Sequence, residues 1–468
     1  MKNIKQKLTQ KFPFLFLVMV LSSTLLFVSC NDDDNDDMII EIIQPTETIV
    51  GIAASNPDFS TLVSILSMPE FSDLFAAANN PDAELTVFAP NNTAFSNLLT
   101  ALGKSSLSEL PIDLVREIIE YHILGQKVLS TQLTNGTVYT LLPYETISID
   151  LASGVKINTA NVIAADLEAT NGVIHVVDTV LLPSFVTNAL GSISEVFLFE
   201  NEYSILSAAL KKANLLNTVS TTQGLTLFAP SNDAFVAAGI TSLDGLDAAA
   251  LSPILLYHVL GAKVLSSELP ADGVATTLSD NQNIYLGYLT NSVLINGLTQ
   301  ITEVDIEKSN GVVHKINRTL VPPAPNVIDI AVALSQAENP EFTVLVSLLT
   351  SPAYSGITQA IIDSDNITVF APTDAAFAEI SSVIPTLTEA QISDILLYHA
   401  VGARVFSTDL SDGQVVEMLN TQDITVNIGS GGVSLTDSTS DVANVLEVNI
   451  QGSNGVIHVI DKVLLPTL

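Results

Sequence analysis

Thr86-Val-Phe-Ala-Pro90, Tyr121-His122 and Asn171-Gly-Val-Ile-His175 are three short motifs that recur together twice more along the chain. The later sets are Thr226-Leu-Phe-Ala-Pro230, Tyr257-His258 and Asn310-Gly-Val-Val-His314, then Thr368-Val-Phe-Ala-Pro372, Tyr398-His399 and Asn454-Gly-Val-Ile-His458. Phe88, Phe228 and Phe370 lie 140 and 142 residues apart, which is the length of a whole domain rather than of a solenoid repeat. The sequence therefore predicts three homologous globular domains in tandem.

Proline-bearing segments mark the boundaries between the three copies. Pro183-Ser184 closes the first copy, and Pro322-Pro323-Ala324-Pro325 separates the second from the third. Successive prolines favour a stiff, extended connection. We expect the domains at residues 47–184, 190–322 and 326–467. The 47% hydrophobic and 14% charged composition fits domains with well-filled cores.

Helices are expected in the first half of each copy. Asn56-Pro57 and Asn339-Pro340 each combine an N-cap residue with proline at the first helical position. The residue after each Phe-Ala-Pro is also a good N-cap, and the three are Asn91, Ser231 and Thr373. A longer helix ends at each Tyr-His pair, and the glycine expected to mark its exit is Gly125, Gly261 or Gly402.

Strands are expected in the second half of each copy. Asn135-Gly136 is a turn dipeptide, and the alternation from Ile424 to Ile428 is typical of a strand. Helices followed by strands predict the α+β class, with a β-sandwich or wedge flanked by helices.

The N-terminus resembles the export signal of a bacterial lipoprotein. Four lysines within the first 11 residues precede an apolar run from Phe14 to Val28, which is shorter than the ~20 residues of a membrane span. Leu26-Phe-Val-Ser29 then resembles a lipobox, with Phe27 where leucine is usual, and Cys30 follows it. We predict a signal peptide at residues 1–29 and a lipid on Cys30. The alternative is an uncleaved cysteine in an anchor helix.

Acidic residues dominate the segment after the cysteine. Residues 31–37 hold only Asn and Asp, and we interpret residues 30–46 as an acidic tether. The run resembles the surface-export signals of Bacteroidetes lipoproteins, so we expect an outer-membrane lipoprotein displayed on the cell surface. The alternative is an anchor that faces the periplasm.

The net charge limits the possible partners. Without the four N-terminal lysines, the 16 basic residues fall to 12 against 50 acidic ones, and the net charge changes from −34 to −38. Nucleic acids and anionic lipid headgroups need clustered Lys and Arg, so neither is expected as a direct partner. The membrane is expected to be reached only through the N-terminal lipid.

The three motifs, in this order and spacing, resemble those of the fasciclin domain. The resemblance covers roughly residues 47–467. It implies an extracellular protein associated with cell adhesion or matrix contact, and an extracellular protein or glycan as the ligand. We expect no enzymatic activity and no cofactor.

The histidines could alternatively serve a metal site or catalysis. A zinc site needs a third protein ligand, and the only cysteine is Cys30. No Gly-x-Ser-x-Gly elbow supports a catalytic serine. We therefore expect no metal site, and interpret the motif residues as structural, with a metal-binding or enzymatic role of the Tyr-His pairs as the alternative. These residues are Tyr121, His122, His175, Tyr257, His258, His314, Tyr398, His399 and His458.

Two acidic positions are the candidate adhesion contacts. In animal matrix members of the family, an Asp-Ile pair just upstream of the Asn-Gly-Val-x-His motif is attributed to integrin binding. The matching pairs are Asp166-Leu167, Asp305-Ile306 and Asn449-Ile450. An exposed carboxylate could complete a metal site on a receptor, or the residue could be an ordinary strand-edge Asp.

These observations favour a lipid-anchored adhesion or ligand-contact protein whose weak contacts add up through effective concentration. A periplasmic structural scaffold is the alternative.

Overall fold

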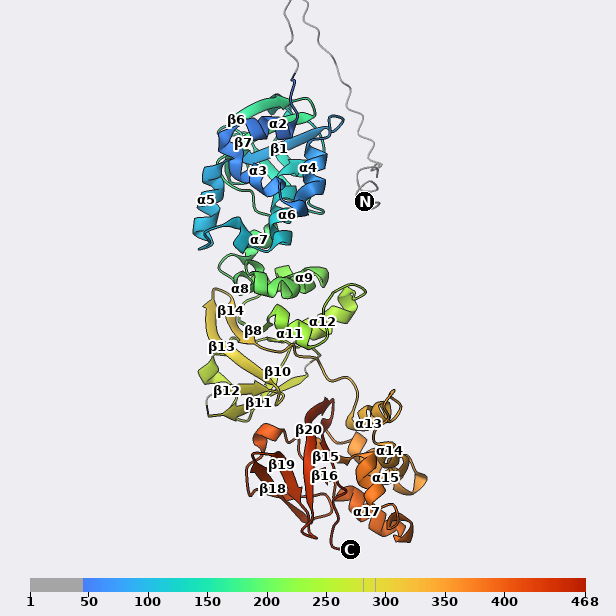
Figure 1. Cartoon of the computed structure of the whole chain (residues 1–468). Coiled ribbons are helices and arrows are strands. Elements are labelled where there is room, and N and C mark those ends of the chain that lie inside the picture. The colour runs from blue at the N-terminus through green and yellow to red at the C-terminus, as the bar shows by residue number, and fades with distance from the viewer. Residues whose placement is uncertain (1–44, 281, 291) are drawn as a thin grey trace, which may run out of the picture. The chain divides into compact units, whose positions relative to one another are not determined.

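The computed structural model describes residues 45–280, 282–290 and 292–468 (Figure 1). The predicted signal peptide, Cys30 and the predicted tether up to residue 44 lie outside the described residues. Within them, no single helix has the length and apolar character of a membrane span. Two sharply bent helix pairs, Ile49–Ser55 with Pro57–Leu66 and Thr343–Leu349 with Pro352–Ile362, meet the length and composition criteria only when each pair is taken together.

The three domains are built on one plan, although domain 2 has four named α-helices before its Phe-Ala-Pro strand where domains 1 and 3 have three. Domain 1 contains α2 (Ile49–Ser55), α3 (Ser60–Leu66), α4 (Ser72–Ala78), β1 (Leu85–Pro90), α5 (Asn92–Ala101), α6 (Ile112–Tyr121), β2 (Ile123–Leu124), β3 (Gly136–Tyr139), β4 (Thr146–Asp150), β5 (Lys156–Ile157), β6 (Ala160–Ala169) and β7 (Gly172–Val177).

Domain 2 follows the same plan and begins with α7, which precedes the expected start at residue 190. Its elements are α7 (Ser184–Ala189), α8 (Glu195–Leu198), α9 (Ser204–Lys212), α10 (Leu216–Thr221), β8 (Leu225–Pro230), α11 (Asn232–Ala237), α12 (Ala248–Leu256), β9 (Val259–Leu260), β10 (Val274–Thr276), β11 (Asn283–Leu289), β12 (Ser292–Ile295), β13 (Thr299–Lys308) and β14 (Gly311–Ile316).

Domain 3 repeats the plan a third time. Its elements are α13 (Val327–Ser335), α14 (Thr343–Leu349), α15 (Ser355–Ile362), β15 (Ile367–Pro372), α16 (Asp374–Glu379), α17 (Glu389–Leu397), β16 (Ala400–Val401), β17 (Val415–Glu417), β18 (Asp423–Gly429), β19 (Gly432–Thr436), β20 (Val442–Gly452) and β21 (Gly455–Ile460).

Each domain has one sheet of seven strands, which in domain 1 run in the order β2-β1-β7-β6-β5-β4-β3. β1 and β7 are parallel, and the other neighbours are antiparallel. The long strand β6 pairs with β7 at one end and β5 at the other, and its register shifts between Val162 and Leu167. The predicted α+β class and tandem organisation are confirmed.

Two cores lie on either side of β1, because alternate side chains of a strand point to opposite faces. Val87 and Ala89 join the core formed with the helices. Phe88 joins a second core with side chains of β4, β5 and β6. Packing on both faces explains why all residues of β1 are buried, Thr86 included.

Three of the predicted helix starts are confirmed by direct caps. The side chains of Asn91, Ser231 and Thr373 accept from the N–H groups three residues later. Asn56 also caps a short 3-10 helix, Pro57–Phe59.

The predicted start at Asn339-Pro340 is wrong. α14 begins only at Thr343, after Phe342 in the left-handed conformation, and Asp374 accepts from Thr343 N and Val344 N at 3.1 and 3.0 Å. In domain 1 the corresponding Asn92 also donates to Pro57 O at 2.9 Å. A carboxylate has no such donor, so domain 3 lacks the bond that holds the earlier start.

The predicted glycine exits of the long helices are also wrong. Gly125, Gly261 and Gly402 follow the two-residue strands β2, β9 and β16 instead of capping the helices. The helix in domain 1 ends at its C-cap His122, whose backbone carbonyl accepts from Phe88 N at 2.9 Å. Strand pairing with a distant segment therefore ends the helix, not a local glycine.

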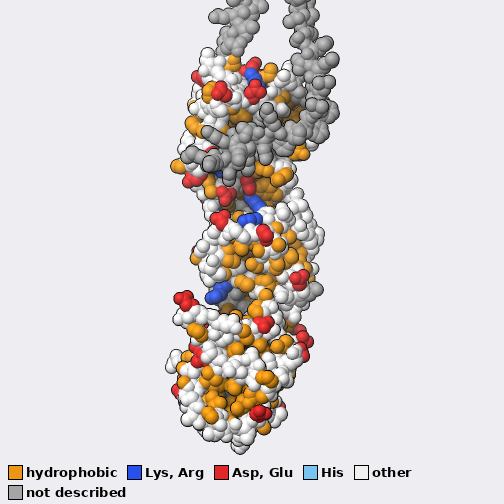
Figure 2. All heavy atoms as spheres, turned by 90° about the vertical axis from the view of Figure 1, so that its right-hand side faces the viewer, with side chains coloured by type: hydrophobic (Ala, Val, Ile, Leu, Met, Phe, Trp, Pro, Cys, Tyr) orange, Lys and Arg blue, Asp and Glu red, His pale blue; other side chains and the backbone are white. Residues whose placement is uncertain are grey.

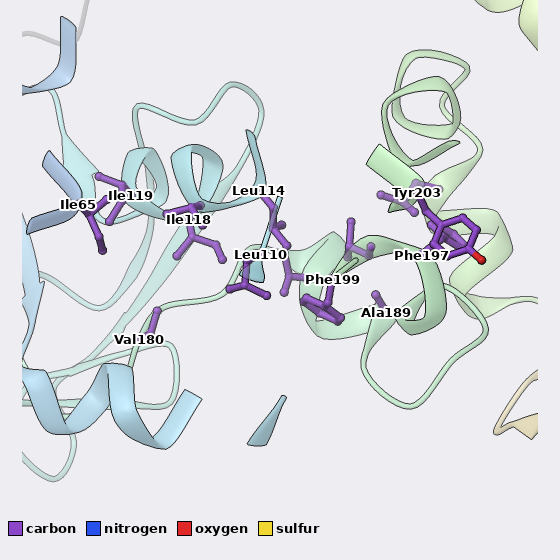
Figure 3. Close-up of a cluster of buried hydrophobic side chains, with 14 of the residues drawn as sticks. Ile65, Leu110, Leu114, Ile118, Ile119, Val180, Ala189, Phe197, Phe199 and Tyr203 are labelled. Carbon is purple, nitrogen blue, oxygen red and sulfur yellow. The ribbon is translucent and has the colours of Figure 1, made fainter. Parts of the chain in front are cut away.

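Domains 1 and 2 share one continuous hydrophobic core, whereas domain 3 has its own. Figure 3 shows Leu110 and Leu114 of domain 1 lying beside Phe199 of domain 2. Lys104 and Glu200 pair at 2.8 Å across the same joint, and Lys211 and Glu117 at 2.5 Å.

Candidate functional site

The Tyr-His pair ties the end of each long helix to the rest of its domain. The ring of His122 is buried, with Nδ1 2.6 Å from Ile118 O and Nε2 accepting from Leu181 N at 2.8 Å. Because a carbonyl only accepts, Nδ1 carries the proton and Nε2 has none. His258 and His399 make the same two contacts in their domains. Tyr121 donates to Thr146 O at 2.8 Å and accepts from Asn158, so it links the helix to β4.

Burial sets the charge of these three histidines. It lowers the pKa of His122, His258 and His399 to about 4, although the hydrogen bond to the helix carbonyl acts in the opposite direction. The rings are therefore neutral at pH 7, and both ring nitrogens of each are already in use. These rings therefore have no free lone pair with which to bind a metal ion or accept a proton.

The second histidine of each domain uses the opposite tautomer. His175 Nε2 donates to Val128 O at 2.9 Å, and Nδ1 accepts from Asp166 N at 3.3 Å. The ring stacks on Phe88 with centroids 5.6 Å apart. His314 repeats both hydrogen bonds, and His458 repeats the bond to the carbonyl. The structure thus brings His175 together with Asp166, and His314 with Asp305.

The Asn-Gly pair of the last motif joins three segments. Asn171 accepts from Ile49 N at 2.8 Å and donates to Ala78 O and Asn80 O at 2.8 and 3.0 Å. A Cβ at Gly172 would lie 2.1 Å from Leu85 O. These two residues allow β7 to approach β1 closely, so their repetition has a structural reason in every domain.

Two further observations bear on the metal and enzyme alternatives. In the part of the chain that the structure describes, no three His, Cys, Asp or Glu side chains lie close enough to hold a metal ion. A cavity of about 30 Å³ beside His122 is lined mainly by apolar side chains such as Ile49 and Ile174. That volume is on the order of one or two water molecules, which is too small for a substrate.

The predicted adhesion residues lie at a place in each domain that we call the bulge site. It comprises Ser130, Asp166 and His175 in domain 1, Ser266, Asp305 and His314 in domain 2, and Ser407, Asn449 and His458 in domain 3. Asp166 sits at the register shift of β6 with a left-handed backbone, φ 59°. Asp and Asn tolerate this conformation better than other non-glycine residues, which accounts for the residue type at this position.

The aspartate of the bulge site is partly exposed and already hydrogen-bonded. Asp166 accepts from Ser130 N at 2.7 Å and from the Ser130 hydroxyl, and its side chain remains 35% exposed. Burial acts to raise the pKa of Asp166, but the Ser130 bonds and the nearby His175 lower it overall. Asp305 has the same arrangement with Ser266, and its pKa is likewise lowered.

The apolar partner of each pair faces inward. Leu167 and Ile306 pack against the hydrophobic core, so neither presents its whole side chain to a ligand. The exposed apolar residues on these strands are instead Ile163, at 55%, and Val304, at 44%.

The serine of the bulge site was not among the residues predicted from the sequence. A fourth repeated motif carries it: Lys127-Val-Leu-Ser130, Lys263-Val-Leu-Ser266 and Arg404-Val-Phe-Ser407. The spacing from each Tyr-His pair is constant, so this signal was present in the sequence.

One face of the molecule carries few basic side chains. Figure 2 shows them scattered among acidic and apolar ones. This agrees with the 16 basic and 50 acidic residues of the chain.

Comparison with known proteins identifies relatives of all three domains. The family model described as the fasciclin domain matches residues 57–183, 201–322 and 340–466. Periostin of Homo sapiens is 27% identical over 383 residues, covering 81% of this chain and 43% of periostin. Protein sll1483 of Synechocystis is 39% identical over 137 residues, covering 29% of this chain and 73% of that protein.

One solved structure is a FAS1 domain pair from the insect cell adhesion molecule fasciclin I. It matches 55% of this chain and 92% of its own at 20% identity, with a TM-score of 0.28. This chain spans about half the length of the vertebrate relatives, with 43%, 53% and 52% of three of them covered.

Proposed function

The chain belongs to the fasciclin family, and on that basis we propose that it is an adhesion or ligand-contact protein, lipid-anchored at Cys30 on the outer surface of a bacterium. Its ligand is an extracellular protein or glycan, bound weakly by more than one domain. Relatives of the chain include periostin of Homo sapiens and fasciclin-1 of Schistocerca americana.

One observation carries the proposal. The histidines, tyrosines and asparagines of the repeated motifs are buried and hydrogen-bonded within the fold, whereas Asp166 and Asp305 keep partly exposed carboxylates. Each accepts two hydrogen bonds from one serine, which leaves further lone pairs on a partly exposed carboxylate. A carboxylate offers about four acceptor positions. Two identical acceptor sites in one chain suit a repeated weak contact.

The serine bonds also fix the direction of each carboxylate. A pre-oriented group loses little conformational freedom on binding, which favours affinity without a large interface. A receptor-bound cation or a ligand N–H group would complement these lone pairs. Because the domains are joined in one chain, a second contact gains from the effective concentration set by the first.

The test uses the full chain with Cys30→Ser, coated on beads and applied to arrays of matrix proteins and glycans. Asp166→Asn with Asp305→Asn removes the two charges but keeps the serine bonds, as Asn449 does with Ser407. We expect binding to fall by about tenfold or more, because the loss at two sites multiplies. The charge-matched control is Asp178→Asn with Asp461→Asn, at carboxylates bonded to Asn161 and Asn444.

Normal binding by the Asp166 and Asp305 double variant would place the contact surface elsewhere. Absence of binding by the parent chain to every probe would contradict an adhesive role. Membrane partitioning of the unaltered chain, compared with the Cys30→Ser chain, tests the anchor separately. If both chains partition equally, the lipid assignment is wrong.

A further inference from the structure

The bulge site of domain 3 differs from the other two in residues that lie next to each other. In domains 1 and 2 a lysine and a glutamate form an exposed pair, Lys127 with Glu168 at 2.8 Å and Lys263 with Glu307 at 2.5 Å. Domain 3 has Arg404 and Gln451 at these positions, and Asn449 replaces the aspartate. Three polar positions of one surface have therefore changed together.

Arg404 uses its guanidinium in two directions. It donates to the carbonyls of Gly452, Ser453 and Gly455 at 3.1, 3.0 and 2.9 Å, which fixes it on its own domain. Its Cζ atom lies over the ring of Tyr285, on β11 of domain 2, 4.6 Å from the ring centroid. A planar, pre-organised guanidinium is suited to stacking in a way that a lysine ammonium is not.

The β11–β12 hairpin of domain 2 covers this surface. Tyr285 lies 5.6 Å from Phe406, ring to ring. A Cβ at Gly287 would lie 2.4 Å from Thr408 Oγ1, so the hairpin approaches too closely for any side chain there. Phe406 is only 3% exposed, whereas its counterparts Leu129 and Leu265 remain partly exposed.

Asn449 explains the change from acid to amide. Its Oδ1 accepts from Ser407 N at 2.8 Å, as the aspartates do with their serines. Its Nδ2 donates to Gly297 O, in the turn after β12, at 3.0 Å. An aspartate at this position would place a negatively charged oxygen next to Gly297 O, and neither atom could donate a hydrogen bond. The position is buried, since Asn449 is 2% exposed. Such an unpaired buried charge is strongly unfavourable.

We propose that the bulge site of domain 3 is an intramolecular receptor for the β11–β12 hairpin of domain 2, with Arg404, Phe406 and Asn449 as its recognition residues. The occupied site is closed to external ligands, whereas the sites in domains 1 and 2 are open. A hairpin that presents a carbonyl cannot bind the open sites in this way, because the carboxylates of Asp166 and Asp305 accept hydrogen bonds and cannot donate one to it. The inference does not depend on the adhesive role.

The test measures the distance between domains 2 and 3 in the full chain carrying Cys30→Ser. Spin labels are placed at the exposed positions Thr241→Cys and Ser382→Cys, and pulsed electron paramagnetic resonance reports their separation. We expect one narrow distance distribution for the parent. Gly287→Leu, which forces the hairpin away from Thr408, should broaden it, and Asn449→Asp should do the same through charge.

Two matched controls separate the joint from general effects on folding. Gly429→Leu alters a glycine in β18, the corresponding strand of domain 3, where nothing lies within 4 Å of the added Cβ. Asp305→Asn is the reverse exchange at an open site. Both should leave the narrow distribution unchanged. Hydroxyl-radical oxidation of Phe406 should rise severalfold in Gly287→Leu and Asn449→Asp and stay constant in the controls.

A broad distribution in the parent, or a narrow one in both Gly287→Leu and Asn449→Asp, would overturn the proposal. Loss of helical circular dichroism in a variant would assign its effect to unfolding, and the other variant then decides. Failure of the bead assay would leave these distances unaffected, so the two proposals can fail separately.

Discussion

The two joints between neighbouring domains are built on different principles. Domains 1 and 2 meet through a continuous apolar core, in which Leu110 and Leu114 lie beside Phe199 (Figure 3). Domains 2 and 3 meet through the contact of the Arg404 guanidinium with the Tyr285 ring and the hydrogen bond from Asn449 to Gly297 O. The hydrophobic effect has no preferred direction, whereas hydrogen bonds and ring contacts depend on geometry. The first joint should therefore control stability, and the second should control orientation.

A prediction with a large expected effect concerns the apolar joint. Phe199 is 3% exposed in the core that domains 1 and 2 share. Phe199→Ala should lower the free energy of unfolding by about 3–5 kcal/mol, because it removes buried area and leaves a cavity. Differential scanning calorimetry should show one transition, for domains 1 and 2 together, moving to lower temperature. Domain 3 should keep its own transition.

The matched change is Phe377→Ala, at a residue 5% exposed in the separate core of domain 3. It should move only the domain 3 transition. If Phe199→Ala leaves the unfolding of domain 1 untouched, the two domains do not share a cooperative core.

The next largest effect is expected from low pH, which should destabilise the unit of domains 1 and 2 and domain 3 to different extents. The folded pKa of His122, His258 and His399 is about 4, below the ordinary value of 6.5. Stability from a neutral buried histidine is complete above pH 6.5 and is lost as the pH falls toward 4, because the unfolded chain takes up the proton first. Each such histidine should lower the free energy of unfolding by about 2 kcal/mol between pH 7.5 and pH 5. The unit of domains 1 and 2 contains two of them, and domain 3 contains one.

Denaturant midpoints at pH 7.5 and pH 5 provide the measurement. Burial also lowers the pKa of His314 in domain 2 and of His458 in domain 3. The unit of domains 1 and 2 therefore contains three such histidines against two in domain 3, and it should lose more free energy of unfolding. His399→Ala should lower the stability of domain 3 at pH 7.5 and flatten its pH dependence. A domain 3 that stays equally sensitive to pH in that variant would assign the effect to other groups.

The smallest expected effect comes from the ion pairs at the apolar joint. Lys104 and Glu200 approach to 2.8 Å, and the Glu200 side chain is 44% exposed. Lys104→Ala should cost less than about 1 kcal/mol in chemical denaturation, because water and salt screen the pair. A loss comparable to that of Phe199→Ala would mean that charge, rather than burial, holds the first joint.

Local features of the fold could be predicted from the sequence. The caps at Asn91, Ser231 and Thr373 depend on a hydroxyl or amide close to the N–H groups it serves, so short motifs suffice. The helix ends could not be predicted in this way, because His122 O pairs with Phe88 N, 34 residues away. The false start at Asn339 has the same origin, since it depends on whether a distant residue is Asp374 or an asparagine.

The site was only partly predictable for a similar reason. The repeated motifs identified Asp166, Asp305 and Asn449 as equivalent positions. Their serine partners belong to a fourth repeated motif, which contains no histidine and was therefore not identified with the other three. Tyr285 and Arg404 lie in different segments of two neighbouring domains, and nothing in either segment alone predicts the contact.

The parallel pairing of β1 with β7 has a consequence for the order of events during synthesis. Leu85 pairs with Gly172, 87 residues later, and Asn171 joins both to the first helix. A ribosome adding about 5–20 residues per second needs roughly 4–17 seconds to cover that interval. Until then the Phe-Ala-Pro strand lacks the neighbour that buries it. Each nascent domain therefore stays incomplete until its last strand emerges, and this waiting period is repeated three times along one polypeptide.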